Sequence, residues 1–84
     1  MHYSGILVVV GPEDVDRAAR SVASLPGVEV HYLYPDSGRL IAVQESATVD
    51  QQQDGLRRIQ ALAGVQMAAL VEHRIDEDRE GGPA

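Results

Sequence analysis

The spacing of hydrophobic residues along this 84-residue chain predicts four strands and two helices. Two apolar stretches, 5–10 and 40–44, are too short for helices, whereas 28–33 and 65–71 alternate between the faces of a strand every second residue. Apolar residues recur at helical spacing in two other segments, 12–25 and 49–63. The predicted order is therefore strand, helix, strand, strand, helix, strand.

The residues between these segments are typical of helix starts and turns. Pro12 suits a first helical turn, and Glu13 and Asp14 follow where the helix dipole favours negative charge. Thr48, followed three residues later by Gln51, fits a capping box for the second helix. The turn at 35–38 predicts a hairpin between the second and third strands.

This order predicts an α+β fold, the ferredoxin-like split βαβ (βαββαβ), with a four-stranded antiparallel sheet and two helices on one face. A weak internal repeat supports it, because Ala19, Val22 and Leu25 recur 37 residues later as Leu56, Ile59 and Leu62. We expect one domain over residues 1–75, followed by an acidic, flexible C-terminal tail over residues 76–84.

The amino-acid composition limits the kinds of partner that this chain is expected to bind. Thirteen acidic residues and seven basic ones, with no lysine, give a net charge of −6, which disfavours nucleic acid and anionic lipid. The longest apolar run, Ile6 to Val10, is far below the roughly 20 residues of a membrane-spanning helix. No secretory signal is visible, so we expect a cytoplasmic protein without membrane insertion.

The predicted fold leaves one sheet face uncovered, because no third helix remains. If Tyr32 pairs with Ile41 and Val30 with Val43, these four residues and Val28 face the helices. For the first strand, either Ile6, Val8 and Val10 or Leu7 and Val9 point outward, and we take the first set. The predicted peptide-binding residues on the uncovered face are then Ile6, Val8, Val10, Glu29, His31, Leu33, Leu40, Ala42 and Gln44. Homodimerisation through this face, or harmless scattered apolar residues, are the alternatives.

Residues that could carry catalysis or hold a metal are few. The histidines His2, His31 and His73 lack the spacing of a metal site, and there is no cysteine. Gly11-Pro12 lacks the further glycines and lysine of a phosphate loop, and the three aromatic residues are all tyrosines. We expect no enzymatic activity, no bound metal and no nucleic acid.

Several segments together resemble the NapD family over roughly residues 3 to 78. They are Ile6 to Val10, Leu25-Pro26-Gly27-Val28-Glu29-Val30, Pro35 to Val43 with Glu45, Gly64-Val65, Leu70-Val71 with His73, and the acidic end. The sequence departs from the family in the strongly apolar Ile6 and Val10, and in Glu72, where an aromatic residue is expected.

The resemblance implies a cytoplasmic chaperone that binds the twin-arginine signal peptide of the catalytic subunit of periplasmic nitrate reductase. Such a chaperone delays export until the molybdenum cofactor has been inserted. The cofactor belongs to the client, so none is expected in this chain, which would act as a monomer or weak dimer.

Two rivals belong to other functional classes. A regulatory domain of the same architecture would bind a small ligand, such as an amino acid, at a dimer interface. A small enzyme resembling acylphosphatase would need an anion-binding loop after the first strand, but Glu13 and Asp14 place carboxylates there.

Overall fold

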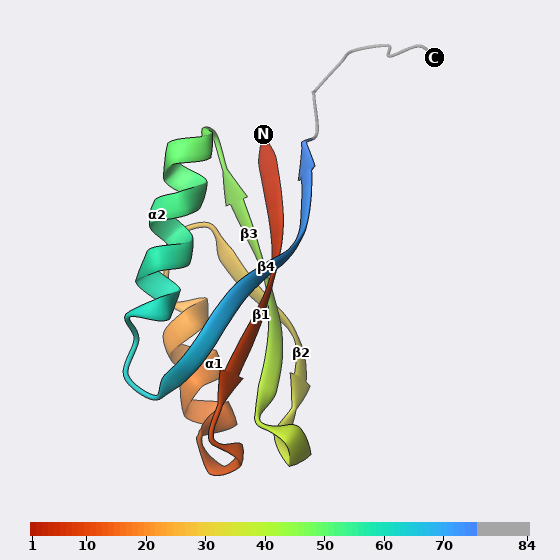
Figure 1. The fold of residues 1–84 in the computed structure, drawn as a ribbon, viewed down its shortest axis with the longest axis vertical. Coiled ribbons are helices and arrows are strands. Elements are labelled where there is room, and N and C mark those ends of the chain that lie inside the picture. Colours follow the sequence, from red (N-terminus) through yellow and green to blue (C-terminus); the bar gives the residue numbers. More distant parts are fainter. Residues whose placement is uncertain (76–84) are drawn as a thin grey trace.

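A computed structural model describes residues 1–75 of the chain (Figure 1). Its four strands and two α-helices follow the predicted order, with short 3-10 helices at Pro12–Asp14 and Pro35–Ser37. The strands are β1 (His2–Val10), β2 (Val28–Tyr34), β3 (Arg39–Ser46) and β4 (Val65–Ile75), and the helices are α1 (Val15–Ala23) and α2 (Val49–Gln60). None of the helices described is long and apolar enough to span a membrane.

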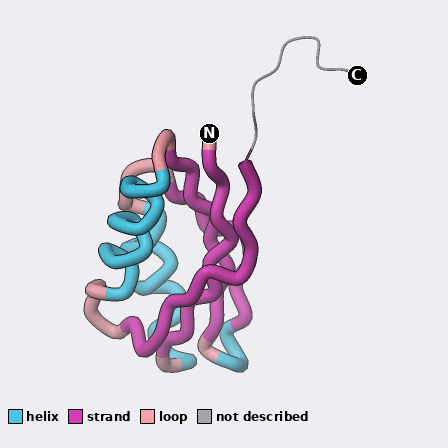
Figure 2. Tube along the Cα trace, turned by 45° about the horizontal axis from the view of Figure 1, so that its top comes forward, coloured by secondary structure: helices cyan, strands magenta, loops and turns pink. Residues whose placement is uncertain are grey.

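The strands form one antiparallel sheet in the order β2-β3-β1-β4. Both α-helices lie on the same side of this sheet, as the turned view in Figure 2 shows. The predicted α+β, ferredoxin-like arrangement is confirmed. The predicted tail, residues 76–84, lies outside the described residues, so the domain boundary stays a prediction.

Local sequence signals fix the start of α2. The Thr48 hydroxyl accepts a hydrogen bond from the Gln51 backbone N–H at 3.1 Å. The Gln51 side chain reaches back and accepts from the Ala47 N–H at 3.0 Å, one residue before the N-cap. Two backbone donors that the helix itself cannot pair are thereby satisfied.

The helix-facing side of the sheet carries the core, and it reverses the predicted orientation of β1 and β3. Ile6, Val8, Val10, Leu40, Ala42 and Gln44, predicted on the uncovered face, are instead buried beneath the helices. Val8 lies opposite both Leu40 and Ala68, and Ile59 of α2 belongs to the same fully buried cluster. Because β1 is apolar on both faces, its own pattern could not distinguish the two orientations.

A β-bulge at His31 explains why the predicted faces of β2 are wrong for Tyr32 and Leu33, which follow it. Tyr32 pairs with Ile41 as predicted, but Val30 pairs with Ala42, not with Val43. One extra residue on β2 therefore separates the two pairs and shifts the alternation. Val28 and Val30 face the helices, as predicted. Tyr32, Ile41 and Val43 were predicted on the same side but lie on the uncovered side.

Two strands are longer than the hydrophobic pattern predicts. β1 begins at His2 and β4 continues to Ile75, because the polar ends of these strands pair with each other, Ser4 opposite His73 and Tyr3 opposite Arg74. Backbone hydrogen bonding between neighbouring strands, which does not depend on hydrophobicity, extends the sheet here.

Candidate functional site

The side of the sheet that the helices leave uncovered is the candidate site, and we call it the open face. Residues that are paired across neighbouring strands share a face, so the register assigns its members. They are Tyr3, Gly5, Leu7 and Val9 of β1, Glu29, Tyr32 and Tyr34 of β2, Arg39, Ile41, Val43 and Glu45 of β3, and Met67, Ala69, Glu72 and Arg74 of β4.

One half of the open face is apolar. Leu7 lies between Ile41 and Ala69, and Tyr32 continues this row onto β2. The next row holds Val9 and Met67, with Arg39 and Tyr34 on the β3 and β2 side. Tyr32 is 60% exposed and Met67 47%, and no other element of the described chain covers them.

The other half of the open face is acidic. Glu29, Glu45 and Glu72 come from three different strands and lie around Gly5 and Val43. Arg74, opposite Tyr3, is also in this half. Because Gly5 has no side chain, the surface dips there between carboxylates.

Two shallow hollows mark the acidic half. One, of about 150 Å³, is lined by Tyr3, Gly27, Glu29, Val43 and Glu45. The other, of about 80 Å³, is lined by residues that include Gly5, Glu72 and Arg74. The Tyr3 hydroxyl donates a 3.4 Å hydrogen bond to Glu45 Oε2 and so orients this carboxylate. Carboxylates set around hollows of this size can receive a guanidinium or ammonium group.

The residues predicted for the site are dispersed by the fold. Glu29 lies on the open face, where its carboxylate is 3.2 Å from His31 Nε2 in an exposed pair. His31 occupies the bulge, and Leu33 lies opposite Leu40 on the helix-facing side at the edge strand β2. The other six predicted residues belong to the buried side described above. The binding role of each remains a prediction.

The sequence held a signal that favoured the correct face of β3. Arg39, Ile41, Val43 and Glu45 alternate with Leu40, Ala42 and Gln44, so the first set carries a charge at both ends of the strand. Charged residues are rarely buried without a partner, which favours the exposed orientation for the first set. The assumed pairing of Val30 with Val43 obscured this signal.

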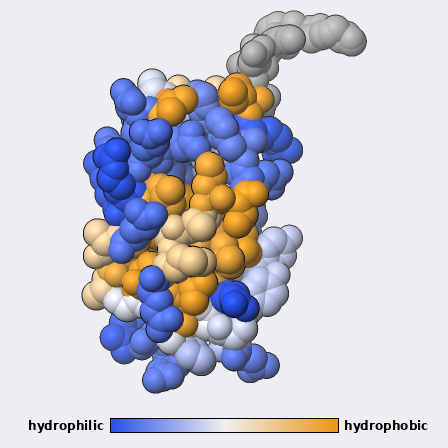
Figure 3. Space-filling model, viewed as in Figure 1, coloured by the Kyte–Doolittle hydropathy of each residue, from blue (hydrophilic) through white to orange (hydrophobic). Residues whose placement is uncertain are grey.

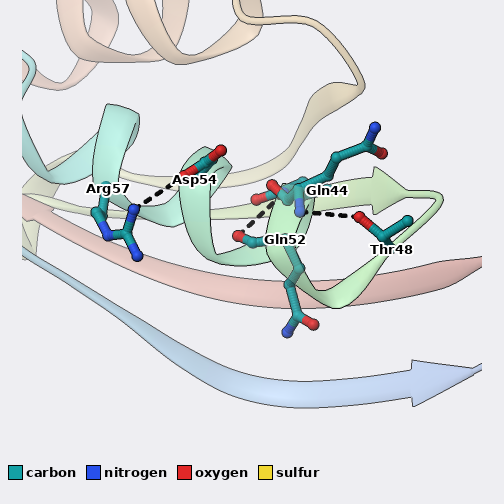
Figure 4. A network of polar contacts seen from close by, with 6 residues as sticks. Gln44, Thr48, Gln52, Asp54 and Arg57 are labelled. Carbon is teal, nitrogen blue, oxygen red and sulfur yellow. Dashed lines mark hydrogen bonds and ion pairs between the residues drawn. The ribbon is translucent and has the colours of Figure 1, made fainter.

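Within residues 1–75, no three histidine, aspartate or glutamate side chains gather where they could hold a metal ion. On the opposite side of the sheet, Gln44 of β3 donates to the Gln52 carbonyl of α2 (Figure 4). The Arg57 to Asp54 ion pair at 2.9 Å lies within α2.

A family model described as NapD protein matches residues 1–77 of the chain. Among curated proteins, none has a significant match to this sequence. The solution structure of the E. coli Tat proofreading chaperone protein NapD superposes with a TM-score of 0.80 at 24% identity, covering 98% of this chain and 86% of that one.

Two further structures share the fold. A hypothetical protein from Pyrococcus horikoshii has a TM-score of 0.77 at 21% identity, with 93% and 94% of the two chains covered. A transcriptional regulatory protein of the AsnC family from Pyrococcus furiosus has a TM-score of 0.66 at 21% identity and covers 96% of this chain, but only 55% of its own length is matched. At these identities, the likeness shows the fold alone.

Proposed function

Since the chain belongs to the NapD family, we propose that it is a chaperone that binds a twin-arginine signal peptide on the open face. The client we propose is the catalytic subunit of periplasmic nitrate reductase, whose export would wait until its molybdenum cofactor has been inserted. The chaperone would work in the cytoplasm and catalyse no reaction. The description of the E. coli structure as a Tat proofreading chaperone supports this role.

The division of the open face into an apolar and an acidic half is the observation that carries the proposal. A twin-arginine signal peptide joins a basic region to an apolar stretch. The apolar stretch would cover Leu7, Val9 and Ile41, and the arginines would lie among Glu29, Glu45 and Glu72. One peptide direction then satisfies both halves, which fixes the orientation of the bound peptide.

The backbone of the sheet favours a helical peptide. β1 and β3 are the two central strands, so their backbone N–H and C=O groups are already paired with strands on both sides. These groups therefore offer few hydrogen bonds to a peptide that lies across them. A helix satisfies its own backbone groups and needs only side-chain contacts. From Tyr3 to Val9 the face runs about 20 Å along β1, which corresponds to roughly 13 residues of helix.

Hydrophobic contact would supply most of the affinity, and the carboxylates would supply selectivity. Each Å² of apolar surface removed from water contributes about 25 cal/mol, but the peptide must also lose its conformational freedom. Carboxylates at the acidic half accelerate the encounter with a basic peptide and discriminate against peptides without arginines.

Calorimetry with a synthetic signal peptide of the proposed client tests this function. The matched control is the same peptide with both arginines replaced by glutamine, and we expect it to bind at least about tenfold more weakly. Amide NMR shifts should report contact at Leu7, Val9, Ile41 and Val43.

Three results would contradict the proposal. They are equal affinity for the two peptides, shifts confined to the helix side, and no binding. A dimer that is stabilised by an amino acid and indifferent to the peptide would favour the ligand-sensing alternative.

A further inference from the structure

Two histidines that are 71 residues apart in the sequence come together where β1 begins and β4 ends. His2 lies opposite Ile75 and His73 lies opposite Ser4, so the two histidines are diagonal neighbours on the helix-facing side of the sheet. Figure 1 shows the start of β1 and the end of β4 side by side at one end of the sheet. Because the strand register forms this pair, no spacing motif in the sequence could reveal it.

The ring nitrogens of the pair face each other. His2 Nδ1 lies 3.2 Å from His73 Nε2, the ring planes are 7° from parallel, and the ring centroids are 5.3 Å apart. When the other nitrogen of each ring carries the proton, the two facing nitrogens are both unprotonated and each has a lone pair to give. A cation that both nitrogens contact would be held by the ends of two strands.

The distance between these nitrogens suits a transition-metal ion. Zn²⁺ binds histidine nitrogen at about 2.0–2.1 Å. Two atoms 3.2 Å apart, each at that distance from one ion, make an angle of about 100° at the ion, which is close to the tetrahedral geometry of zinc. His73 is exposed and His2 is half-buried, so both rings can turn their lone pairs toward such an ion without disturbing the core.

The groups around the pair decide which ions can bind. Within residues 1–75, no carboxylate or third histidine joins His2 and His73, so water molecules would complete the coordination. Mg²⁺ and Ca²⁺ prefer oxygen ligands and are therefore disfavoured, whereas neutral imidazole suits Zn²⁺. The net charge of −6 on the chain attracts cations in general.

A cavity beside His73 provides room for water ligands. It has a volume of about 340 Å³, lies between α2 and the sheet, and is lined by His73 together with Gln52, Val49 and Leu70. Figure 3 shows apolar side chains gathered over the middle of the molecule, where β4 passes α2. An apolar wall next to a metal site limits the access of bulk solvent to the bound ion.

We propose that His2 and His73 form a zinc site that joins the start of β1 to the end of β4. Two imidazole nitrogens and water molecules would hold one Zn²⁺. The bound ion would stabilise the end of the sheet, where neither strand has an apolar pattern of its own. The site lies on the helix-facing side, so this inference does not depend on the signal-peptide function.

Zinc titration of the full chain, prepared without a histidine tag, tests the proposal. We expect calorimetry to show one Zn²⁺ per chain with an affinity in the micromolar range, and no binding of Mg²⁺. NMR of the imidazole nitrogens should show shifts at His2 Nδ1 and His73 Nε2, and none at His31. Saturating Zn²⁺ should also raise the unfolding temperature, because the two nitrogens are together only in the folded chain.

Three matched variants locate the ligands. His2→Gln and His73→Gln each remove one ligand, so we expect each to weaken Zn²⁺ binding at least about tenfold and to reduce the rise in unfolding temperature. His31→Gln is the control, because His31 lies at the surface near the Glu29 carboxylate but belongs to neither strand of the pair. The affinity of this control for Zn²⁺ should equal that of the original chain.

Three results would overturn the proposal. They are no Zn²⁺ binding below millimolar concentration, unchanged affinity in either His2→Gln or His73→Gln, and lost binding in His31→Gln. Binding of the signal peptide is measured separately, in the presence of EDTA. A failure of one inference therefore leaves the other standing.

Discussion

Gly5 of β1 lies directly opposite Glu72 of β4, and a Cβ at Gly5 would lie 3.3 Å from the Glu72 Cβ and 3.7 Å from its Oε1. The Glu72 side chain therefore leans over the strand at the one position where β1 has no side chain. This contact brings a carboxylate from the edge strand toward the centre of the acidic half.

Gly5→Ala tests whether this position of Glu72 contributes to peptide binding. The added methyl must push Glu72 aside by a few tenths of an ångström, so we expect severalfold weaker binding of the signal peptide with little change in fold. Calorimetry and circular dichroism measure the two quantities. Glu72→Gln should weaken binding similarly, whereas Glu13→Gln, outside the sheet, should not. Unchanged affinity in both Gly5→Ala and Glu72→Gln would remove Glu72 from the site.

Adjacent residues of β1 provide a sharp test of the two faces. Leu7→Glu places a charge on the open face, and we expect affinity for the signal peptide to fall about 30-fold while the chain remains folded. Val8, 0% exposed, points to the helices, so Val8→Glu should cost about 4 kcal/mol or more and unfold the domain. Thermal unfolding followed by circular dichroism separates the two. A folded Val8→Glu protein with lost binding would reverse the assignment of the faces.

Two glycines with left-handed backbone, Gly38 and Gly64, allow the cost of a steric overlap to be compared with the cost of backbone strain alone. Gly38 has φ of 70°, and a Cβ there would overlap the Val10 carbonyl oxygen, whereas Gly64 has φ of 87° with nothing within 4 Å of such a Cβ. We expect Gly64→Ala to lower the free energy of unfolding by about 1 kcal/mol, from backbone strain alone. Gly38→Ala should lower it by about 2 kcal/mol or more, because the steric overlap adds to that strain. Urea unfolding measures both, and equal losses would contradict the predicted overlap.

Removing the side-chain cap of α2 should lower the free energy of unfolding by a small amount. Thr48→Ala removes the acceptor for the Gln51 N–H, so we expect the free energy of unfolding to fall by about 1 kcal/mol. Thr48→Ser keeps the hydroxyl and should stay within a few tenths of a kcal/mol of the original. If Thr48→Ser lowers the free energy of unfolding as much as Thr48→Ala does, the hydrogen bond to the Gln51 N–H is not the cause of the loss.

The sequence was sufficient for the fold because each element carries a local signal. Gly11-Pro12 and Thr48 mark helix starts and Pro35 to Gly38 marks the hairpin. Two strands are marked by short apolar runs and two by period-two alternation. These signals arise within a few residues, so one sequence contains them. The order of elements and the single helix-covered face followed from them.

The site was harder to predict, because it depends on which face of each strand meets the helices. The bulge at His31 inserts one residue without a glycine or proline to mark it, and it moves Val30 opposite Ala42. Counting alternation through His31 therefore gave the wrong side for Tyr32, Ile41 and Val43. The central strand β1 could not correct the error, since Ile6, Val8 and Val10 are as apolar as Leu7 and Val9.

The position of β1 between β3 and β4 constrains how the domain can form during synthesis. One edge of β1 stays without its partner until β4 leaves the ribosome more than fifty residues later. The core around Val8 also remains incomplete until Ala68 arrives. Long-range strand pairing of this kind is slow to form, so the binding surface is assembled only after β4 has been synthesised.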